Sequence, residues 1–282
     1  MRRFPLLAAA ALAALSPRAA FADDPGSLEA QVEKKAPAIV SLKFVLKAEG
    51  GGGESNGEAV GAMADPSGLV VLSNDHFTGS PRQLKVLFGN DPTEHEAVLV
   101  AKDTKLGLAW VQVLDLGDKP AAAVDLLKPA DIKVGLALFG VSRSGRGFDY
   151  APSVERLYVS AKIEKPRAMW GVAGEFGEAG LPVFDLAGNA VGVLSDQGGS
   201  DAVSEEEPSA SKTCLLPLDV VAKSLALAKK RVPEAVAKAK EAKEAKEPAG
   251  MDEGAMDGAK PPEKPPPSPD APKPPQPPDQ PK

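Results

Sequence analysis

Between residues 38 and 216 the sequence consists of short apolar runs separated by turn-forming residues, with almost no helical periodicity. Typical runs are 38–46 and 69–72, and typical turns are Asp-Pro-Ser-Gly at 65–68 and Gly-Asn-Asp-Pro at 89–92. β-branched residues favour strands, whereas Gly, Pro, Asn and Asp favour tight turns. A succession of short strands at close intervals predicts an all-β barrel or sandwich.

Helices are expected only at the two edges of this region. Ser27 can cap a short helix that ends at Pro37, and apolar residues at helical spacing predict a closing helix over 218–230. The Gly-rich run 49–57 is expected to be a flexible loop, and it lacks the Gly-Lys-Ser/Thr ending of a phosphate-binding loop. The polar, acidic stretch 196–212 is expected to be a long exposed loop.

The N-terminal residues 1–22 have the features of a secretory signal peptide. Two arginines precede the apolar run 6–15, which is too short for an ordinary membrane span, and Ala-Phe-Ala at 20–22 is a small-x-small cleavage site. Because Arg18 lies close to that site, an uncleaved membrane anchor remains the alternative. No other stretch is apolar over the length that a membrane span requires, so we expect an exported protein that is soluble once cleaved.

Charge argues against nucleic acid as a partner. The chain has a formal net charge of −6, and removal of residues 1–22, with three arginines and no acidic residue, changes it to −9. Nucleic-acid binders need a surplus of Lys and Arg to neutralise phosphates. A protein this acidic is therefore expected to be a poor nucleic-acid binder.

The C-terminal segment 231–282 is expected to lie outside the folded domain as a disordered, low-complexity tail. Its part 233–247, rich in Ala, Lys and Glu, could form a helix, but an isolated helix of that length is marginal. From Lys260 onward proline is the commonest residue, so the segment should be extended and solvated. It can serve as a spacer or as a tail that binds the cell wall or a partner.

The most specific motif is the loop Gly-Glu-Ala-Gly-Leu-Pro at 177–182, followed by a hairpin turn at 185–189 and the apolar run 190–193. This pattern resembles the nucleophile loop of trypsin-like serine proteases, in particular the HtrA/Deg-like branch, whose motif is Gly-Asn-Ser-Gly-Gly-Pro-Leu. Ser-Asn-Asp-His at 73–76 is similar to the Thr-Asn-x-His of that family, and the resemblance extends roughly over residues 30–230.

The resemblance implies a trypsin-like double β-barrel with a C-terminal helix over residues 23–230. The PDZ domain that often accompanies such proteases is expected to be absent, since no second globular domain is predicted. Proteases of this family act through a serine nucleophile, a histidine that takes its proton and a carboxylate that orients the histidine.

Two of the three catalytic positions are changed in this chain. His76 matches the general base, although an extra residue between Gly68 and His76 leaves open that it is an ordinary, partly exposed histidine. Gly107 stands where the family has its aspartate, and Ala179 stands where it has its serine. The chain is therefore identified as a catalytically degenerate member, since a methyl group cannot attack a carbonyl.

The neighbours of the nucleophile position are changed as well. Glu178 replaces the usual Asn, and Leu181 replaces the second Gly. The resemblance implies that backbone N–H groups near Gly177, Glu178 and Ala179 are what remains of an oxyanion pocket. A carboxylate at position 178 would make that pocket less welcoming to an anion.

Other sources of catalysis receive little support from the sequence. A shifted register would put Asp103 in place of the missing carboxylate, and Ser142 or Ser144 would be the candidate nucleophiles of a shifted triad. Cys214 lies in a predicted apolar strand without a basic neighbour, so a buried inert thiol is expected. Two histidines, His76 and His95, are too few for a convincing zinc site, and no cofactor is expected.

These features predict an exported pseudoprotease of the bacterial periplasm or cell envelope that binds polypeptide as a scaffold, regulator or chaperone-like module. One alternative is an active HtrA-like endopeptidase with a shifted triad. Another is a structural envelope protein that acts through its Pro-rich tail. The sequence leaves the identity of the partner and the oligomeric state open.

Overall fold

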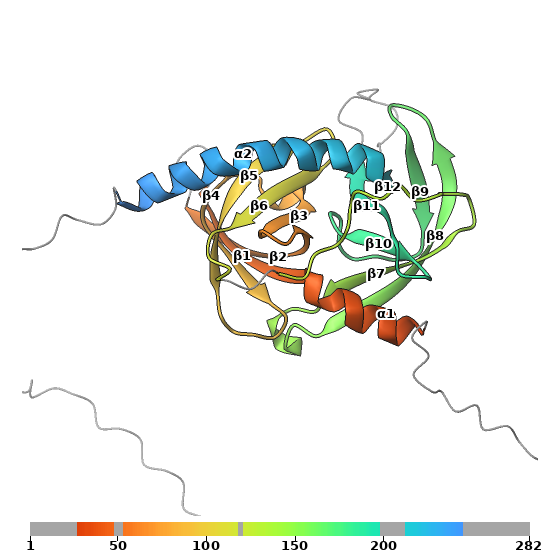
Figure 1. The fold of residues 1–282 in the computed structure, drawn as a ribbon, viewed down its shortest axis with the longest axis horizontal. Coiled ribbons are helices and arrows are strands. Elements are labelled where there is room, and N and C mark those ends of the chain that lie inside the picture. The colour runs from red at the N-terminus through yellow and green to blue at the C-terminus, as the bar shows by residue number, and fades with distance from the viewer. Residues whose placement is uncertain (1–26, 48–52, 118–120, 198–211, 245–282) are drawn as a thin grey trace, which may run out of the picture. The chain divides into compact units, whose positions relative to one another are not determined.

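The computed structural model describes residues 27–47, 53–117, 121–197 and 212–244. The predicted signal peptide and the Pro-rich part of the predicted tail lie outside the described residues. Two closed antiparallel β-barrels follow one another along the chain, each of six strands. The predicted all-β double barrel is thereby confirmed (Figure 1).

The first barrel has the strand order β1-β2-β3-β6-β5-β4. Its strands are β1 (Ile39–Lys47), β2 (Glu54–Asp65), β3 (Leu69–Ser73), β4 (Ser80–Phe88), β5 (His95–Asp103) and β6 (Leu108–Val113). The short 3-10 helix η2 (Asn74–His76) directly follows β3. Strands β3 and β6 are buried along their whole length, as expected of apolar runs at the centre of a barrel wall.

The second barrel has the strand order β10-β11-β12-β9-β8-β7. Its strands are β7 (Ala137–Arg143), β8 (Pro152–Ile163), β9 (Met169–Ala173), β10 (Pro182–Asp185), β11 (Ala190–Gln197) and β12 (Lys212–Pro217). The 3-10 helix η3 (Arg146–Phe148) lies between β7 and β8. The hairpin turn predicted at 185–189 joins β10 to β11, and Asp185 accepts hydrogen bonds from the backbone and side chain of Asn189.

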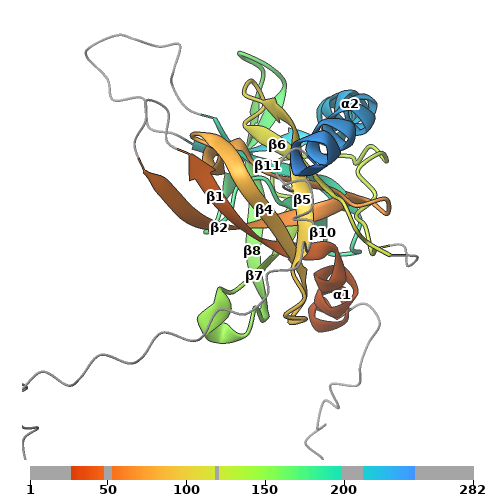
Figure 2. The same cartoon turned by 90° about the vertical axis from the view of Figure 1, so that its left-hand side faces the viewer.

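Helices lie on opposite sides of the barrels. Helix α1 (Leu28–Lys35) begins at Ser27, whose side chain accepts a hydrogen bond from the N–H of Ala30 at 3.2 Å, as predicted for its cap. The 3-10 helix η1 (Ala36–Ala38) then leads into β1. Figures 1 and 2 show α1 on one side of the barrels and helix α2 (Leu218–Glu244) along the other.

The predicted loop over 49–57 is wrong at its C-terminal end, because β2 begins at Glu54 and pairs with β1. Gly57 lies opposite Phe44, and a Cβ atom at position 57 would be only 2.1 Å from the ring of Phe44. The glycine that indicated a loop in fact makes room for an aromatic side chain inside the barrel.

The predicted end of the closing helix at residue 230 is also wrong, because α2 continues without interruption to Glu244. The part up to Lys230 packs as predicted, with Val221, Leu225 and Ala228 all buried. Packing of this face supplies the stability that an isolated Ala/Lys/Glu-rich helix would lack, so the helix propagates into the segment expected to be disordered.

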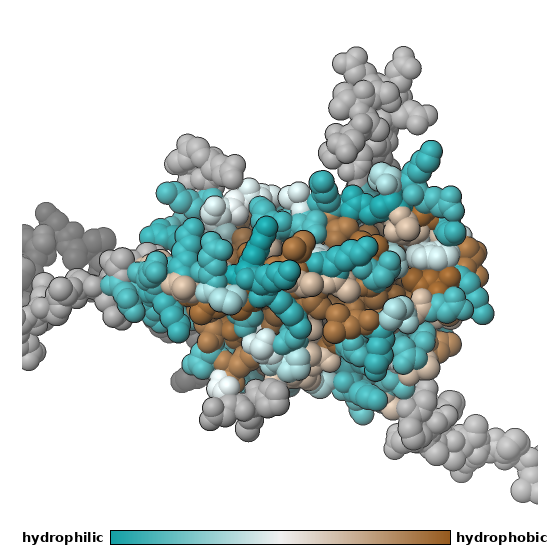
Figure 3. All heavy atoms as spheres, turned by 45° about the horizontal axis from the view of Figure 1, so that its top comes forward, coloured by the Kyte–Doolittle hydropathy of each residue, from teal (hydrophilic) through white to brown (hydrophobic). Residues whose placement is uncertain are grey.

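The outer surface is mainly hydrophilic, with hydrophobic residues visible between polar ones on the face shown in Figure 3. Among the described residues, the exposed large hydrophobic side chains come from loops, from η3, from β8 and from α2: Leu127, Val134, Phe148, Val154, Tyr158, Leu186 and Leu227. Hydrophobic residues that are exposed singly are normal on a protein surface. No helix in the described ranges is long and apolar enough to cross a membrane.

Candidate functional site

Three segments that the sequence analysis singled out converge where the two barrels meet. The N–H of Asn74, in η2, donates to the carbonyl oxygen of Gly107 at 2.9 Å. Gly180 has φ +88°, and a Cβ atom there would be 2.0 Å from the backbone nitrogen of Ser73. The loop 177–180 is therefore docked against the end of β3, next to the segment that carries His76.

The side chain of His76 faces this loop. Its Nε2 lies 3.3 Å from Oε1 of Glu178, and the two side chains are 27% and 23% exposed. The imidazole ring also lies beside Phe44, with 6.2 Å between the ring centroids. The structure thus places His76 beside the 177–180 loop at the junction of the two barrels, which we call the cleft.

Glu178 spans the cleft from the second barrel to the first. Its Oε1, which contacts His76, also accepts a hydrogen bond from the backbone N–H of Val60 in β2 at 3.2 Å. A carboxylate is an acceptor only, so it is attracted to an imidazole nitrogen that carries its proton. With its proton in place, Nε2 cannot accept another from a hydroxyl.

Ala179 lies between Glu178 and Gly180 and presents a methyl group where a nucleophile would be required. Within the described part of the chain, the N–H groups of Gly177 and Ala179 have no hydrogen-bond acceptor. The N–H of Gly180 donates to the carbonyl oxygen of Leu194 at 2.7 Å. The loop thus has two N–H groups that no hydrogen bond within the described residues occupies.

Position 107 has no acidic side chain and little room for one. Gly107 has φ +67°, and a Cβ atom there would be 2.7 Å from Oγ of Ser195. Ser195 donates to the carbonyl oxygen of Leu106 at 2.5 Å and accepts from Nε2 of Gln197 at 2.8 Å. This hydrogen-bond network fills the space next to Gly107, so a substituted residue would also face a strained backbone.

Asp103 is held by other partners. Its Oδ2 accepts a hydrogen bond from Oγ of Ser224 in α2 at 2.8 Å, and its Oδ1 accepts from the N–H of Leu106 at 3.1 Å. Oγ of Ser224 in turn accepts from Nε1 of the buried Trp110 at 3.0 Å. These contacts give Asp103 a structural role and do not support the shifted register.

The shifted triad is not favoured either. Ser142 lies in β7 opposite Ser153, and the N–H of Ser144 donates to the carbonyl oxygen of Ala151 at 2.9 Å. Over the described ranges, neither serine hydroxyl forms a hydrogen bond with His76.

A cavity of about 190 Å³ adjoins the Glu178 carboxylate and is walled by β1, β2 and the segment after β7. Arg143 lines it with a guanidinium group that donates to the carbonyl oxygens of Ala36, Ile39 and Tyr150 at 2.6, 2.5 and 2.9 Å. Desolvation by burial lowers the pKa of Arg143. This side chain joins the second barrel to the segment that begins the first.

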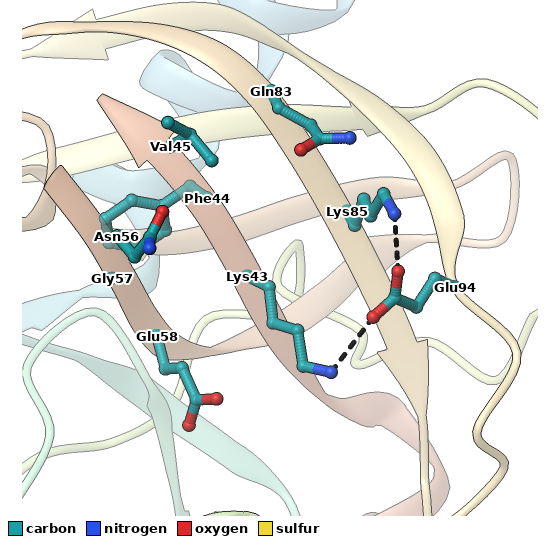
Figure 4. Close-up of a pocket in the computed structure, with 9 residues that line it drawn as sticks. All are labelled: Lys43, Phe44, Val45, Asn56, Gly57, Glu58, Gln83, Lys85 and Glu94. Atoms are coloured by element: carbon teal, nitrogen blue, oxygen red, sulfur yellow. Dashed lines mark hydrogen bonds and ion pairs between the residues drawn. The ribbon is translucent and has the colours of Figure 1, made fainter. Parts of the chain in front are cut away.

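A second cavity, of about 350 Å³, lies over β1, β2 and β4 (Figure 4). Glu94 bridges Nζ of Lys43 at 3.0 Å and Nζ of Lys85 at 2.5 Å. Hydrogen bonds from Lys85 and Lys43 lower the pKa of Glu94 to about 2. Lys43 and Glu58 line both cavities, so the two hollows are neighbours.

The remaining candidates do not form a site. Cys214 is buried, at 3% exposure, as predicted. Nδ1 of His95 lies 2.7 Å from the carbonyl oxygen of Asp115, and its ring packs edge-on against Phe88. Among the residues that the structure describes, no group of three or more His, Cys, Asp or Glu side chains could hold a metal ion.

Comparisons with known proteins identify the fold. No protein-family model and no curated protein matches the sequence. A similar solved structure is that of the HtrA-type protease AlgW, in a serine-to-alanine form with a tripeptide. It shares 17% sequence identity with this chain at a TM-score of 0.52, over 70% of this chain and 62% of the other. The fold is accordingly a trypsin-like double β-barrel with a C-terminal helix.

Proposed function

We propose that this protein is an exported, catalytically inactive relative of trypsin-like serine proteases that binds polypeptide in its cleft without cutting it. The observation that carries the proposal is the contact of His76 Nε2 with the Glu178 carboxylate, immediately before the methyl group of Ala179. A binding role as scaffold, regulator or chaperone-like module needs the cleft but no catalytic triad.

Each catalytic requirement has a physical obstacle in this cleft. The nucleophile position has no hydroxyl, the base nitrogen faces an acceptor, and the orienting position is a glycine in a left-handed conformation. Loss of the serine alone from a complete triad lowers turnover on the order of a millionfold, and further losses add little. Catalysis by this site is therefore not expected.

Polypeptide binding is supported by what the cleft retains. The unbonded N–H groups of Gly177 and Ala179 can donate to the carbonyl oxygens of an extended chain, which is the backbone chemistry of peptide recognition. The two neighbouring cavities extend the cleft along β1 and β2. The structurally similar protease was solved with a tripeptide.

Export to the periplasm or cell envelope of a bacterium is part of the same proposal. It rests on the signal-peptide features of residues 1–22 and on the resemblance to HtrA-type proteins, which are usually exported.

The proposal is tested with the purified protein and fluorescently labelled, unfolded casein. Fluorescence anisotropy should report saturable binding, and mass spectrometry of the same sample after prolonged incubation should recover casein intact. A fluorophosphonate probe should label no serine. Casein fragments accompanied by a labelled serine would show a working endopeptidase, and absence of any casein binding would refute the binding role.

A further inference from the structure

We propose that the cleft is a binding site for a peptide carboxylate, which the free protein occupies with its own Glu178. A polypeptide that offers a carboxylate displaces the Glu178 side chain and takes over its contacts. This inference rests on the proposed function and deepens it, because it names the chemical group that the cleft recognises.

The internal carboxylate reveals which donors the cleft offers. Oε1 of Glu178 lies 3.3 Å from Nε2 of His76 and accepts from the N–H of Val60 at 3.2 Å. The two donors come from η2 and β2 of the first barrel, whereas Glu178 belongs to the second. An imidazole and a backbone N–H that converge on one oxygen form an acceptor site suited to an anion.

The charges around the neighbouring 190 Å³ cavity fit the same ligand. Its charged lining consists of Lys43 and Arg143 against Glu58 and Glu178. With Glu178 displaced, the fixed charges of the lining are two positive and one negative, and the arriving carboxylate restores the balance. Figure 4 shows Lys43 with Glu94, whose carboxylate is shared with the second ammonium group of Lys85.

A buried phenol lies beside the same cavity. Tyr150 lines the cavity at 9% exposure, and Nζ of Lys43 lies 6.0 Å from the centroid of its ring. Its hydroxyl is closed off from solvent, so it could donate to a ligand carboxylate only after a shift of the ring.

The backbone that carries this tyrosine is strained. Asp149 and Tyr150 have φ values of 55° and 51°, a conformation that non-glycine residues seldom adopt. Strain of this kind persists where the surrounding structure enforces it, often at ligand sites. Here one of the two strained residues, Tyr150, lines the cavity.

Displacement of Glu178 is energetically feasible. The side chains of His76 and Glu178 are 27% and 23% exposed to solvent. Ion pairs with access to solvent contribute little net free energy. The carboxylate can therefore leave at small cost when an equivalent group takes its place.

The test follows the imidazole signals by NMR in the full-length protein. The chain has only two histidines, so a His95→Gln background leaves the His76 resonance alone. The probes are acetyl-tetra-alanine with a free C-terminal carboxylate, the same peptide as its carboxamide, and a carboxamide peptide with one internal Asp. The free acid should shift the His76 resonance saturably, whereas the tetra-alanine carboxamide should not.

A variant separates displacement from simple addition. Glu178→Ala should bind the free acid about two- to fivefold more tightly, because the internal competitor is gone but its solvent-accessible contact contributed little. The matched control is Glu175→Gln, which removes the same charge from an exposed residue just before the 177–180 loop and should leave the affinity unchanged. Far-UV circular dichroism confirms that both variants are folded.

The outcomes decide between the alternatives. Three outcomes would overturn the proposal. The first is equal binding of the free acid and the carboxamide, and the second is no binding of either carboxylate peptide by wild type or by Glu178→Ala. The third is an affinity for the free acid that is unchanged in Glu178→Ala. Preference for the Asp peptide over the free acid would support it and assign the carboxylate to a side chain instead of the terminus. If casein binds but carboxylates do not, only this inference fails. If carboxylate peptides bind and casein does not, only the proposed function fails.

Discussion

A histidine that acts as general base needs an unprotonated nitrogen beside the hydroxyl that it deprotonates. In this cleft, Nε2 of His76 lies 3.3 Å from a carboxylate oxygen of Glu178. With a carboxylate at position 178, Nε2 of His76 faces an acceptor and not a hydroxyl. The same carboxylate accepts from the N–H of Val60, so Glu178 also ties the two barrels together across the cleft.

Restoring the serine alone should not restore activity. We predict that Ala179→Ser, and the double variant Ala179→Ser/Glu178→Asn, remain unlabelled by a fluorophosphonate and leave casein intact. The double variant frees Nε2 but still lacks an orienting acid, whose loss from a complete triad costs about 10⁴-fold in turnover. Rapid labelling of the serine introduced at position 179 would contradict this account.

At the scale of elements, two hydrogen bonds of Ser224 fasten helix α2 to the first barrel. Oγ of Ser224 bridges Nε1 of Trp110 and the carboxylate of Asp103. Trp110 is fully buried in β6, so its N–H has no access to water. The apparent catalytic candidate Asp103 thus belongs to the support of α2.

Ser224→Ala should destabilise the fold, because it leaves the buried N–H of Trp110 without its partner and removes one hydrogen bond from the half-buried Asp103. The expected loss is about 1–3 kcal/mol of unfolding free energy, measured by urea denaturation. The control is Lys223→Ala, an exposed neighbour on the same helix. An unchanged midpoint for Ser224→Ala would show that these hydrogen bonds do not support the helix.

The ion pair between Lys229 of α2 and Asp65 makes the stability of the fold depend on pH. Burial raises the pKa of Asp65, but hydrogen bonds from Lys229 and Ser67 outweigh it and hold the pKa at about 2, below the ordinary 3.8. A lowered carboxyl pKa contributes stability that is complete above about pH 4 and is lost as the pH falls towards 2.

Asp65→Asn removes this contribution. Because the pair with Lys229 is partly exposed, the variant should be less stable than wild type by up to about 1 kcal/mol at pH 6. The difference should shrink at pH 3, where the wild-type contribution is itself being lost. Urea denaturation at both values measures it, and a difference that does not change with pH would contradict the assignment.

For the whole molecule, much of the fold could be predicted because short strands and turns leave a local signature. The run 38–46 became β1, and the turn at 65–68 joins β2 to β3. The extension of α2 to Glu244 could not be predicted, since it depends on the packing of the preceding turns against a barrel far away in the sequence.

Part of the candidate site could be predicted from the sequence, and part of it could not. A motif marked His76, Gly107 and Ala179, because the loops that carry them have a recognisable local sequence. The contacts of Val60 and Arg143 left no such signal, because they join residues 118 and 104 positions apart in the sequence. Tyr150 left none either, because it lies in a loop whose backbone is strained. The chemistry of the cleft could therefore be inferred only from the assembled barrels.

The central claim is that polypeptide binds in this cleft, and site-specific cross-linking tests it most directly. Gly177→Cys places a thiol at the cleft, where an added Cβ meets no atom within 4 Å, and Leu227→Cys places one on the outward face of α2. The native Cys214 is buried and should not react. With a benzophenone on each thiol, unfolded casein should be captured intact at position 177 and not at position 227. Capture at position 227 alone would contradict the account.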